Sequence, residues 1–308
     1  MTDHDPGAWD EAHNAPILSW HPESAPEQLP DHPVHLVVEP SEPGRLHGRM
    51  LYEPFDSGTL IVSLHGALNR GRFKVPRFEW RRTLNQVQCA RLYLSDSTLE
   101  QSGSLEIGWY IGSAQQDLIS EYAESVRAIA RNGGYTRVMC VGSSAGGFGA
   151  LALSRQIAGS AAVVFSPQTS IAGYLPSHKR ALTAAAFKDR GSLNDIEAEF
   201  GERVNMRKLY KASADTNYVR FVQNTRDRFH FEAHYAPFAL SLGVDPDTGG
   251  STPDGRISFH AERQEEGHAP PSRGRFLKHI DDAHQQFFGT NLTIIPAEAL
   301  QGKDLGNR

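Results

Sequence analysis

The chain has 308 residues, of which 39% are hydrophobic and 22% are charged, as is typical of an ordinary globular protein. A formal net charge of −5 argues against a broad nucleic-acid-binding surface, and a mean hydropathy of −0.45 without a long apolar run argues against a membrane span. Cys89 and Cys140 are too few for a disulfide scaffold or a cysteine zinc site. Residues 1–6 are acidic and lack an apolar core, so we expect a cytoplasmic protein without a secretory signal.

Residues 1–33 differ in composition from the rest of the chain, because they are rich in proline, histidine and acidic residues. Such a composition predicts an N-terminal tail or an extended wrap. Its apolar residues can anchor part of it on the body: Trp9, Ile17, Leu18 and Trp20. We expect residues 34–308 to form one domain, since α/β folds often reach this size with a single core.

From residue 35 onward, strand-like and helix-like segments alternate. Short apolar runs predict strands at 35–38, 46–52, 59–64, 90–94, 137–141, 161–165, 218–223 and 257–260. Apolar residues at steps of three or four predict helices at 115–131, 148–157 and 272–288. This alternation predicts an α/β fold with a mainly parallel central sheet and helices on both faces.

Residues 170–214 break the alternation, because they separate two predicted strands and carry their own helix-forming patches. The usual connection in such folds has about 2–6 residues. We therefore expect an inserted helical cap or lid in this stretch. An ordinary crossover with extra helices is the alternative.

A G-x-S-x-G motif spans residues 142–146, between a predicted buried strand and a predicted helix. A nucleophile on a sharp strand-to-helix turn needs small neighbours, which Gly142 and Gly146 supply. The following helix N-terminus favours developing negative charge at Ser144. Ser143 is the rival serine, but only Ser144 has glycines on both sides at the required spacing. The alternative is a Gly/Ser loop that binds a phosphate or simply turns.

With this motif in its context, residues 35–290 resemble the α/β-hydrolase superfamily. The resemblance implies an acid after a later strand and a histidine after the last strand, in the order Ser, acid, His. Asp227 and His268 match those places, so Asp227 would orient the imidazole and His268 would take the proton of Ser144. The competing acids are Asp245, Asp247 and Asp254. The competing histidines are His230, His234 and His260; the first two lie close to Asp227 in sequence, and we expect them to pack or face solvent.

The same resemblance implies an oxyanion hole made of two backbone amides. One belongs to Ala145, directly after Ser144, and the other to Ala67, in a His-Gly turn with Gly66 close behind. We expect His65 to shape this turn rather than to act as the base.

Residues 70–82 alternate basic and aromatic residues beside the expected site. Arg72 and Trp80 are candidates to bind an anionic or sugar-like substrate, since arginine pairs with carboxylate and phosphate. A solvated surface around buried aromatics is the competing and favoured interpretation of such a run. By fold position, Trp109 and Tyr110 are also candidates to line the pocket.

Other signals for metals and cofactors are weak. Residues 245–249 resemble the start of a calcium-binding loop, but Arg256 occupies the position of its terminal Glu, so a turn is the better interpretation. His230 and His234 have helical metal spacing without the HExxH arrangement. Phosphate-binding and dinucleotide fingerprints are missing, so we expect neither a metal nor a cofactor.

These features predict a serine hydrolase that cleaves a carboxylic ester, of a small molecule or a glycan, through an acyl-enzyme intermediate. One alternative is an acyltransferase or deacylase acting on a glycan or glycoprotein. Residues 108–110 and 165–169 are similar to stretches of glycan-modifying hydrolases from accessory secretion and surface-polysaccharide pathways. A second alternative is a non-catalytic binding protein on the same fold.

Overall fold

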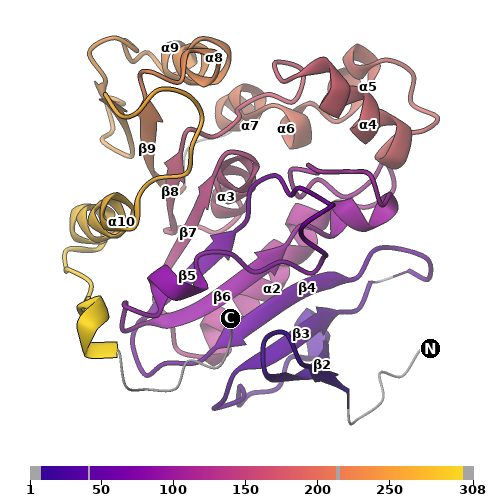
Figure 1. Ribbon diagram of the computed structural model, residues 1–308, viewed down its shortest axis with the longest axis vertical. Coiled ribbons are helices and arrows are strands. Elements are labelled where there is room, and N and C mark those ends of the chain that lie inside the picture. Colours follow the sequence, from indigo (N-terminus) through magenta and orange to yellow (C-terminus); the bar gives the residue numbers. More distant parts are fainter. Residues whose placement is uncertain (1–7, 41, 213–215, 301–308) are drawn as a thin grey trace.

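The computed structural model describes residues 8–40, 42–212 and 216–300. Its described strands form one sheet in the order β1-β2-β3-β4-β6-β5-β7-β8-β9-β11-β10. The strands are β1 (Trp9–Asp10), β2 (Ala15–Trp20), β3 (Val34–Val38), β4 (Gly48–Glu53), β5 (Thr59–Leu64), β6 (Ala90–Ser95), β7 (Arg137–Ser143), β8 (Ala161–Phe165), β9 (Tyr218–Asn224), β10 (Gly250–Ser251) and β11 (Ile257–Glu262). In Figure 1 the sheet runs from the N-terminal strands at the lower right to β9 at the upper left.

The strands from β6 to β11 in this order are parallel, whereas β4 is antiparallel to both of its neighbours. Because the strands are parallel, the carboxyl ends of β5, β7, β8, β9 and β11 meet at one edge. The segments that follow these five strands carry Ala67, Ser144, Gln168, Asp227 and His268 of the site described below. The prediction of a mainly parallel sheet is confirmed.

Helices cover both faces of the sheet. They are α1 (Arg81–Leu84), α2 (Leu118–Asn132), α3 (Ala145–Arg155), α4 (Pro176–Ala186), α5 (Leu193–Glu199), α6 (Gly201–Val204), α7 (Met206–Ala212), α8 (Arg228–His230), α9 (Ala236–Ser241) and α10 (Arg273–Phe288). Short turns are η1 (Pro22–Ser24), η2 (Ser97–Gln101), the π-turn η3 (Phe231–Tyr235) and η4 (Ala297–Leu300). None of the described helices has the length and apolar character needed to cross a membrane.

Two hydrophobic clusters lie on opposite faces of the sheet. One contains Tyr122 of α2, Phe148 of α3 and Phe238 of α9. The other contains Leu84 of α1 and the apolar side of α10. Buried apolar residues at steps of three or four along α2 and α10 explain why these two helices were predictable.

The helix ends follow ordinary capping chemistry. The Asp117 side chain accepts the Ser120 N–H at the start of α2, and the Ser272 side chain does the same for Arg275 at the start of α10. Helix α3 begins at Ala145, three residues before the predicted start. Its first turn contains Gly146 and Gly147, whose low helix propensity conceals it in the sequence.

The N-terminal segment contributes to the sheet. Strand β2 adds to the edge in parallel with β3, and Trp20 is buried there. The carboxylate of Asp10 binds Nδ1 of His13 at 2.8 Å and of His35 at 2.7 Å, which ties β1 to β3. The segment predicted as a tail or wrap therefore contains two unpredicted strands, β1 and β2, and residues 1–7 lie outside the described part of the chain.

The described residues between β8 and β9 include four helices, α4 to α7, which lie between the upper middle and the upper right of Figure 1. Helix α7 packs on α3 and α9. From α6, the Arg203 guanidinium donates to the carbonyls of Ile111, Ser113 and Gln116. These contacts join the insertion to the loop before α2. A lid role for residues 170–214 stays a prediction, and residues 213–215 are not described.

Candidate active site

Ser144 lies on a strained turn between β7 and α3. Its φ of 56° and ψ of −121° are unusual for a residue with a side chain, and such strain clusters at functional sites. The glycines around it are required by space. A Cβ added at Gly142 would lie 2.3 Å from the Gly146 backbone, and one at Gly146 would lie 2.3 Å from the Leu64 carbonyl oxygen. The turn can therefore form only with glycine at both positions.

The two serines of the motif have different environments. Ser143 is buried, and its hydroxyl donates to the Phe165 carbonyl at 3.2 Å. Ser144 is half-buried and is available from the carboxyl edge of the sheet. It directly precedes the first turn of α3, where the unpaired backbone N–H groups favour negative charge. These facts favour Ser144 over Ser143 as the nucleophile.

The loop after β5 lies beside Ser144. A Cβ added at Gly66 would lie 3.9 Å from the Ser144 Cβ. Among the described residues, neither the Ala67 amide nor the Ala145 amide has an acceptor. Ala67 is exposed, whereas Ala145 is buried at the helix start. In this part of the chain, the amide at the start of α3 and the amide that follows Gly66 are thus both without an acceptor.

Hydrogen bonds fix the shape of this loop. His65 Nε2 accepts the Asp96 N–H at 2.9 Å, which leaves the proton on Nδ1 to be donated to the Gly66 carbonyl at 2.7 Å. The Tyr110 hydroxyl accepts the His65 N–H at 2.6 Å. Both nitrogens of the His65 ring are therefore occupied in holding the turn.

Asp227 follows β9 and is bound by two histidines. Its Oδ2 lies 2.6 Å from His268 Nδ1, and its Oδ1 lies 3.0 Å from His230 Nδ1 and 3.3 Å from the His230 N–H. Burial raises the pKa of the Asp227 carboxyl, but the hydrogen bonds from both histidines outweigh burial and hold this pKa well below its usual range. The carboxylate is therefore ionised at neutral pH, as an orienting acid must be.

The structure also brings His230 into the site, although its closeness to Asp227 in sequence predicted that it would pack or face solvent. Its side chain is only 4% exposed. Gln168, from the loop after β8, is fully buried between Ser144 and this histidine. Its Nε2 lies 2.9 Å from Ser144 Oγ and 2.9 Å from His230 Nε2. Neither role was predicted; the only available signal was that both residues follow carboxyl ends of parallel strands.

Asn224, the last residue of β9, positions the loop that carries His268. Its Nδ2 donates to the carbonyls of Glu265 at 2.7 Å and Gly267 at 3.1 Å. Its Oδ1 accepts the N–H groups of Arg226 at 3.0 Å and Gln264 at 3.1 Å. All four hydrogen-bonding positions of this amide are used.

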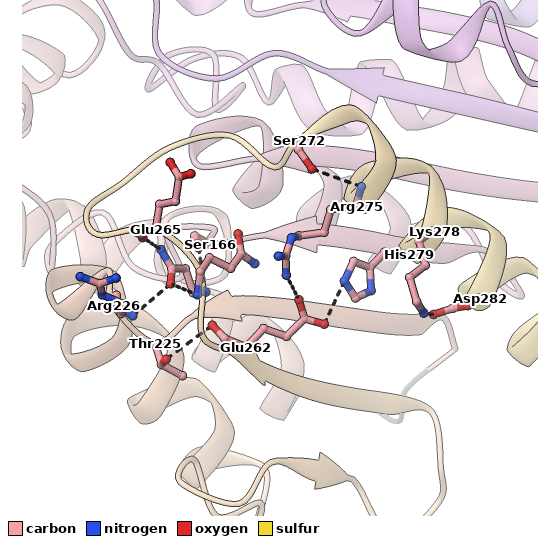
Figure 2. A network of polar contacts seen from close by, with 12 residues as sticks. Ser166, Thr225, Arg226, Glu262, Glu265, Ser272, Arg275, Lys278, His279 and Asp282 are labelled. Carbon is pink, nitrogen blue, oxygen red and sulfur yellow. Dashed lines mark hydrogen bonds and ion pairs between the residues drawn. The ribbon is translucent and has the colours of Figure 1, made fainter. Parts of the chain in front are cut away.

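Figure 2 shows the polar contacts around this loop. On one side, the Arg226 guanidinium binds Glu266 at 3.0 Å. On the other, Glu262 at the end of β11 binds Arg275 at 2.6 Å and His279 at 3.1 Å, both from α10. The segment between β11 and α10 is thereby attached at both ends, while the His268 side chain remains 32% exposed.

The predicted substrate-binding residues have varied surroundings. Arg72 is exposed, and contact with substrate stays a prediction for it. Trp80 stacks on Phe276 of α10, with ring centroids 4.2 Å apart, so its partly buried ring packs against the core. Trp109 and Tyr110 are 0% exposed. Trp109 Nε1 donates to Gln168 and the Tyr110 hydroxyl accepts the His65 N–H, so both side chains support the site, and contact with substrate stays a prediction for them.

The competing acids Asp245 and Asp254 form local contacts. Asp254 accepts the Thr252 hydroxyl at 2.6 Å within its own turn, and Asp245 accepts the Asp247 N–H.

Within the described residues, Asp227, His230 and His268 are close enough to hold a metal ion. Each Nδ1 there faces a carboxylate oxygen at hydrogen-bond distance, which accounts for the grouping without an ion.

No protein-family model matches the chain, and no curated protein matches it. Among solved structures it is similar to the capsule O-acetyltransferase of Neisseria meningitidis serogroup A, with a TM-score of 0.56, 13% identity and coverage of 82% of this chain and 98% of that one. It is also similar to an S-formylglutathione hydrolase from Agrobacterium tumefaciens, with a TM-score of 0.52, 15% identity and coverage of 83% and 94%.

A third similar structure is a chain of the Glycosylation Associate Protein (Gap123) complex from Streptococcus agalactiae. The TM-score is 0.58 at 11% identity, and the match covers 80% of this chain but 46% of that chain. At such identities the likeness shows the fold alone. The chain has the α/β-hydrolase fold, as the sequence predicts, and proteins of this fold that it resembles include a hydrolase and an acetyltransferase.

Proposed function

We propose that this protein is a serine hydrolase that cleaves a carboxylic ester through an acyl-enzyme intermediate. The observation that carries the proposal is the 2.6 Å contact between Asp227 and His268, from separate loops at the edge of the sheet where Ser144 occupies its strained turn. A nucleophile, a base and an orienting acid on three such loops are the parts that acyl transfer requires.

In the first half of the reaction, Ser144 Oγ attacks the acyl carbonyl carbon while His268 Nε2 takes the hydroxyl proton. The Asp227 carboxylate holds the Nδ1 proton of His268 and stabilises the imidazolium that forms. The oxyanion of the tetrahedral intermediate accepts from the amides of Ala145 and Ala67. The bond to the alcohol oxygen then breaks, and His268 returns the proton to the leaving alcohol.

In the second half, His268 removes a proton from water, which attacks the acyl carbon. The bond to Ser144 Oγ breaks, the serine recovers its proton and a carboxylic acid leaves. The triad residues supply the nucleophile, base and acid of both halves, so the proposed reaction needs no cofactor.

Hydrolysis of p-nitrophenyl acetate tests the proposal, with release of p-nitrophenolate measured for the wild type, Ser144→Ala and Ser143→Ala. We expect turnover by the wild type and Ser143→Ala but only background release by Ser144→Ala. Equal turnover by Ser144→Ala would contradict it. Binding of an ester without turnover of any activated ester would instead favour a non-catalytic binding protein.

Acyl transfer to a glycan is the second candidate. His268 is 32% exposed and Ala67 is exposed, so a bulky acceptor alcohol can approach the site. The fold similarity to a capsule O-acetyltransferase supports the same direction. Partition of the acyl group between water and an added sugar separates the two reactions: an acetylated sugar formed faster than acetate indicates transfer.

A further inference from the structure

Gln168 makes three side-chain contacts whose directions are fixed by chemistry. Its Oε1 lies 3.2 Å from Trp109 Nε1, and an indole nitrogen can only donate. The amide oxygen must therefore face Trp109. The Nε2 group then faces Ser144 Oγ and His230 Nε2, each at 2.9 Å, with one proton for each.

This orientation determines where the Ser144 proton can go. Because Gln168 donates to Ser144 Oγ, the serine hydroxyl cannot give its own proton to Gln168. The proton is left for another acceptor, which in the proposed reaction is His268 Nε2. Gln168 thus occupies one lone pair of the Ser144 oxygen, and the serine proton stays available to a base.

The same orientation determines the state of His230. Since Gln168 donates to His230 Nε2, that nitrogen carries no proton, and the ring proton lies on Nδ1, facing Asp227 Oδ1. Burial lowers the pKa of His230, which agrees with a neutral ring. A protonated Nε2 would oppose the amide protons of Gln168 and displace that side chain from Ser144.

We propose that Gln168 and His230 form a positioning pair that directs the Ser144 hydroxyl toward His268, with Trp109 and Asp227 anchoring its two ends. The proposal rests on the proposed function, because it concerns the same nucleophile. In this arrangement the Asp227 carboxylate orients both histidines. It orients His268 through Oδ2 and, through Oδ1, His230 and then Gln168.

The test is the second-order rate constant for labelling of Ser144 by a fluorophosphonate, from time courses of intact mass. Gln168→Met removes the donor and keeps the size, so we expect labelling about tenfold slower, the effect of losing one hydrogen bond of typical strength. His230→Leu should slow labelling as well. His230→Gln places an amide oxygen where it can accept from Gln168, and should recover part of the rate.

The double variant Gln168→Met/His230→Leu tests whether the two residues act together. If they act through one shared hydrogen bond, the combined slowing falls well short of the product of the single effects. Gln116→Met is the matched control, since Gln116 is also buried and makes side-chain hydrogen bonds, to Leu46 and Glu121. It should label at the wild-type rate. Thermal unfolding of each variant shows that labelling is measured on folded protein.

If the wild type is labelled and Gln168→Met is labelled at the same rate, the positioning pair is overturned and the serine hydrolase proposal stands. If His230→Gln slows labelling as much as His230→Leu does, the shared role of His230 is overturned. The same follows if the slowing in the double variant equals the product of the two single effects. Failure of the wild type to label would contradict the proposed function itself.

Discussion

The rings of His230 and His268 lie face to face, with centroids 3.8 Å apart and planes at 12°. Both donate Nδ1 protons to the same carboxylate, that of Asp227, through different oxygens. Two imidazolium rings at this separation would repel strongly. His230 is buried and His268 is one-third exposed, so we expect the positive charge that forms in the proposed reaction to lie on His268.

Asp227→Asn should slow fluorophosphonate labelling by about 10³-fold or more, as loss of the orienting acid does in related triads. An asparagine Nδ2 group donates, so it would favour a His268 ring whose proton lies on Nε2 and not on Nδ1. Such a ring could not take the Ser144 proton at Nε2. Asp254→Asn is the control, because this acid bonds within its own turn. A rate within threefold of wild type for Asp227→Asn would exclude this residue as the acid.

Gly146→Ala should destabilise the protein by about 3 kcal/mol or more, since the new methyl group would lie 2.3 Å from the Leu64 carbonyl oxygen and the backbone would have to shift. Urea unfolding measures the change. Gly274→Ala in α10 has open space around the new methyl group and should leave stability unchanged or slightly increased. Similar midpoints for the two variants would show that the turn tolerates a side chain.

Asn224→Ala should slow labelling about tenfold while the protein stays folded, because the loop of His268 loses three hydrogen bonds and the Arg226 N–H loses a fourth. Asn217→Ala removes another fully buried amide, which bonds Ser154 and Tyr210. It should lower the unfolding temperature without changing the labelling rate of the folded protein. If both variants label alike, Asn224 does not position His268.

The free energy of unfolding should fall as the pH decreases from 6.5 toward 4. Burial lowers the pKa of His234 to about 3 and that of His260 to about 4, from an ordinary value of 6.5. In this window the unfolded chain binds protons that the folded chain does not, so stability is full above pH 6.5 and declines below it. Urea unfolding at several pH values measures the decline.

His234→Asn should reduce this pH dependence. An asparagine Oδ1 can still accept the Thr169 N–H that His234 Nδ1 accepts at 3.3 Å, but it does not titrate. The exposed His21 supplies the control variant His21→Asn, for which we expect the wild-type slope. An unchanged slope in His234→Asn would show that this ring does not contribute to the acid sensitivity.

The features that could be predicted from the sequence are those that depend on a local pattern of residues. Continuous apolar runs located β5 and β8 to the residue, and the glycines around Ser144 located the turn. Strand β2 was missed because it contains a proline and alternates poorly between buried and exposed positions. The contact between Asp227 and His268 followed from a resemblance in chain order, and the structure brings these two residues together.

Gln168 and His230 were not predictable in the same way. The role of Gln168 depends on three partners, Trp109, Ser144 and His230, which lie 59, 24 and 62 residues away in sequence. Nothing in a local pattern marks such a convergence. His230 follows Asp227 by three residues, and the helical turn at α8 is what directs its Nδ1 back to that carboxylate.

Whether Ser144 is an activated nucleophile is best measured by intact mass after incubation with a fluorophosphonate. We expect one adduct on the wild type, which maps to the peptide containing Ser144 and is missing from Ser144→Ala. The Ser143→Ala variant should be labelled like the wild type. An unlabelled wild type, folded and exposed to reagent that labels a control hydrolase, would show that Ser144 is not activated. An adduct that persists in Ser144→Ala would show that another residue reacts.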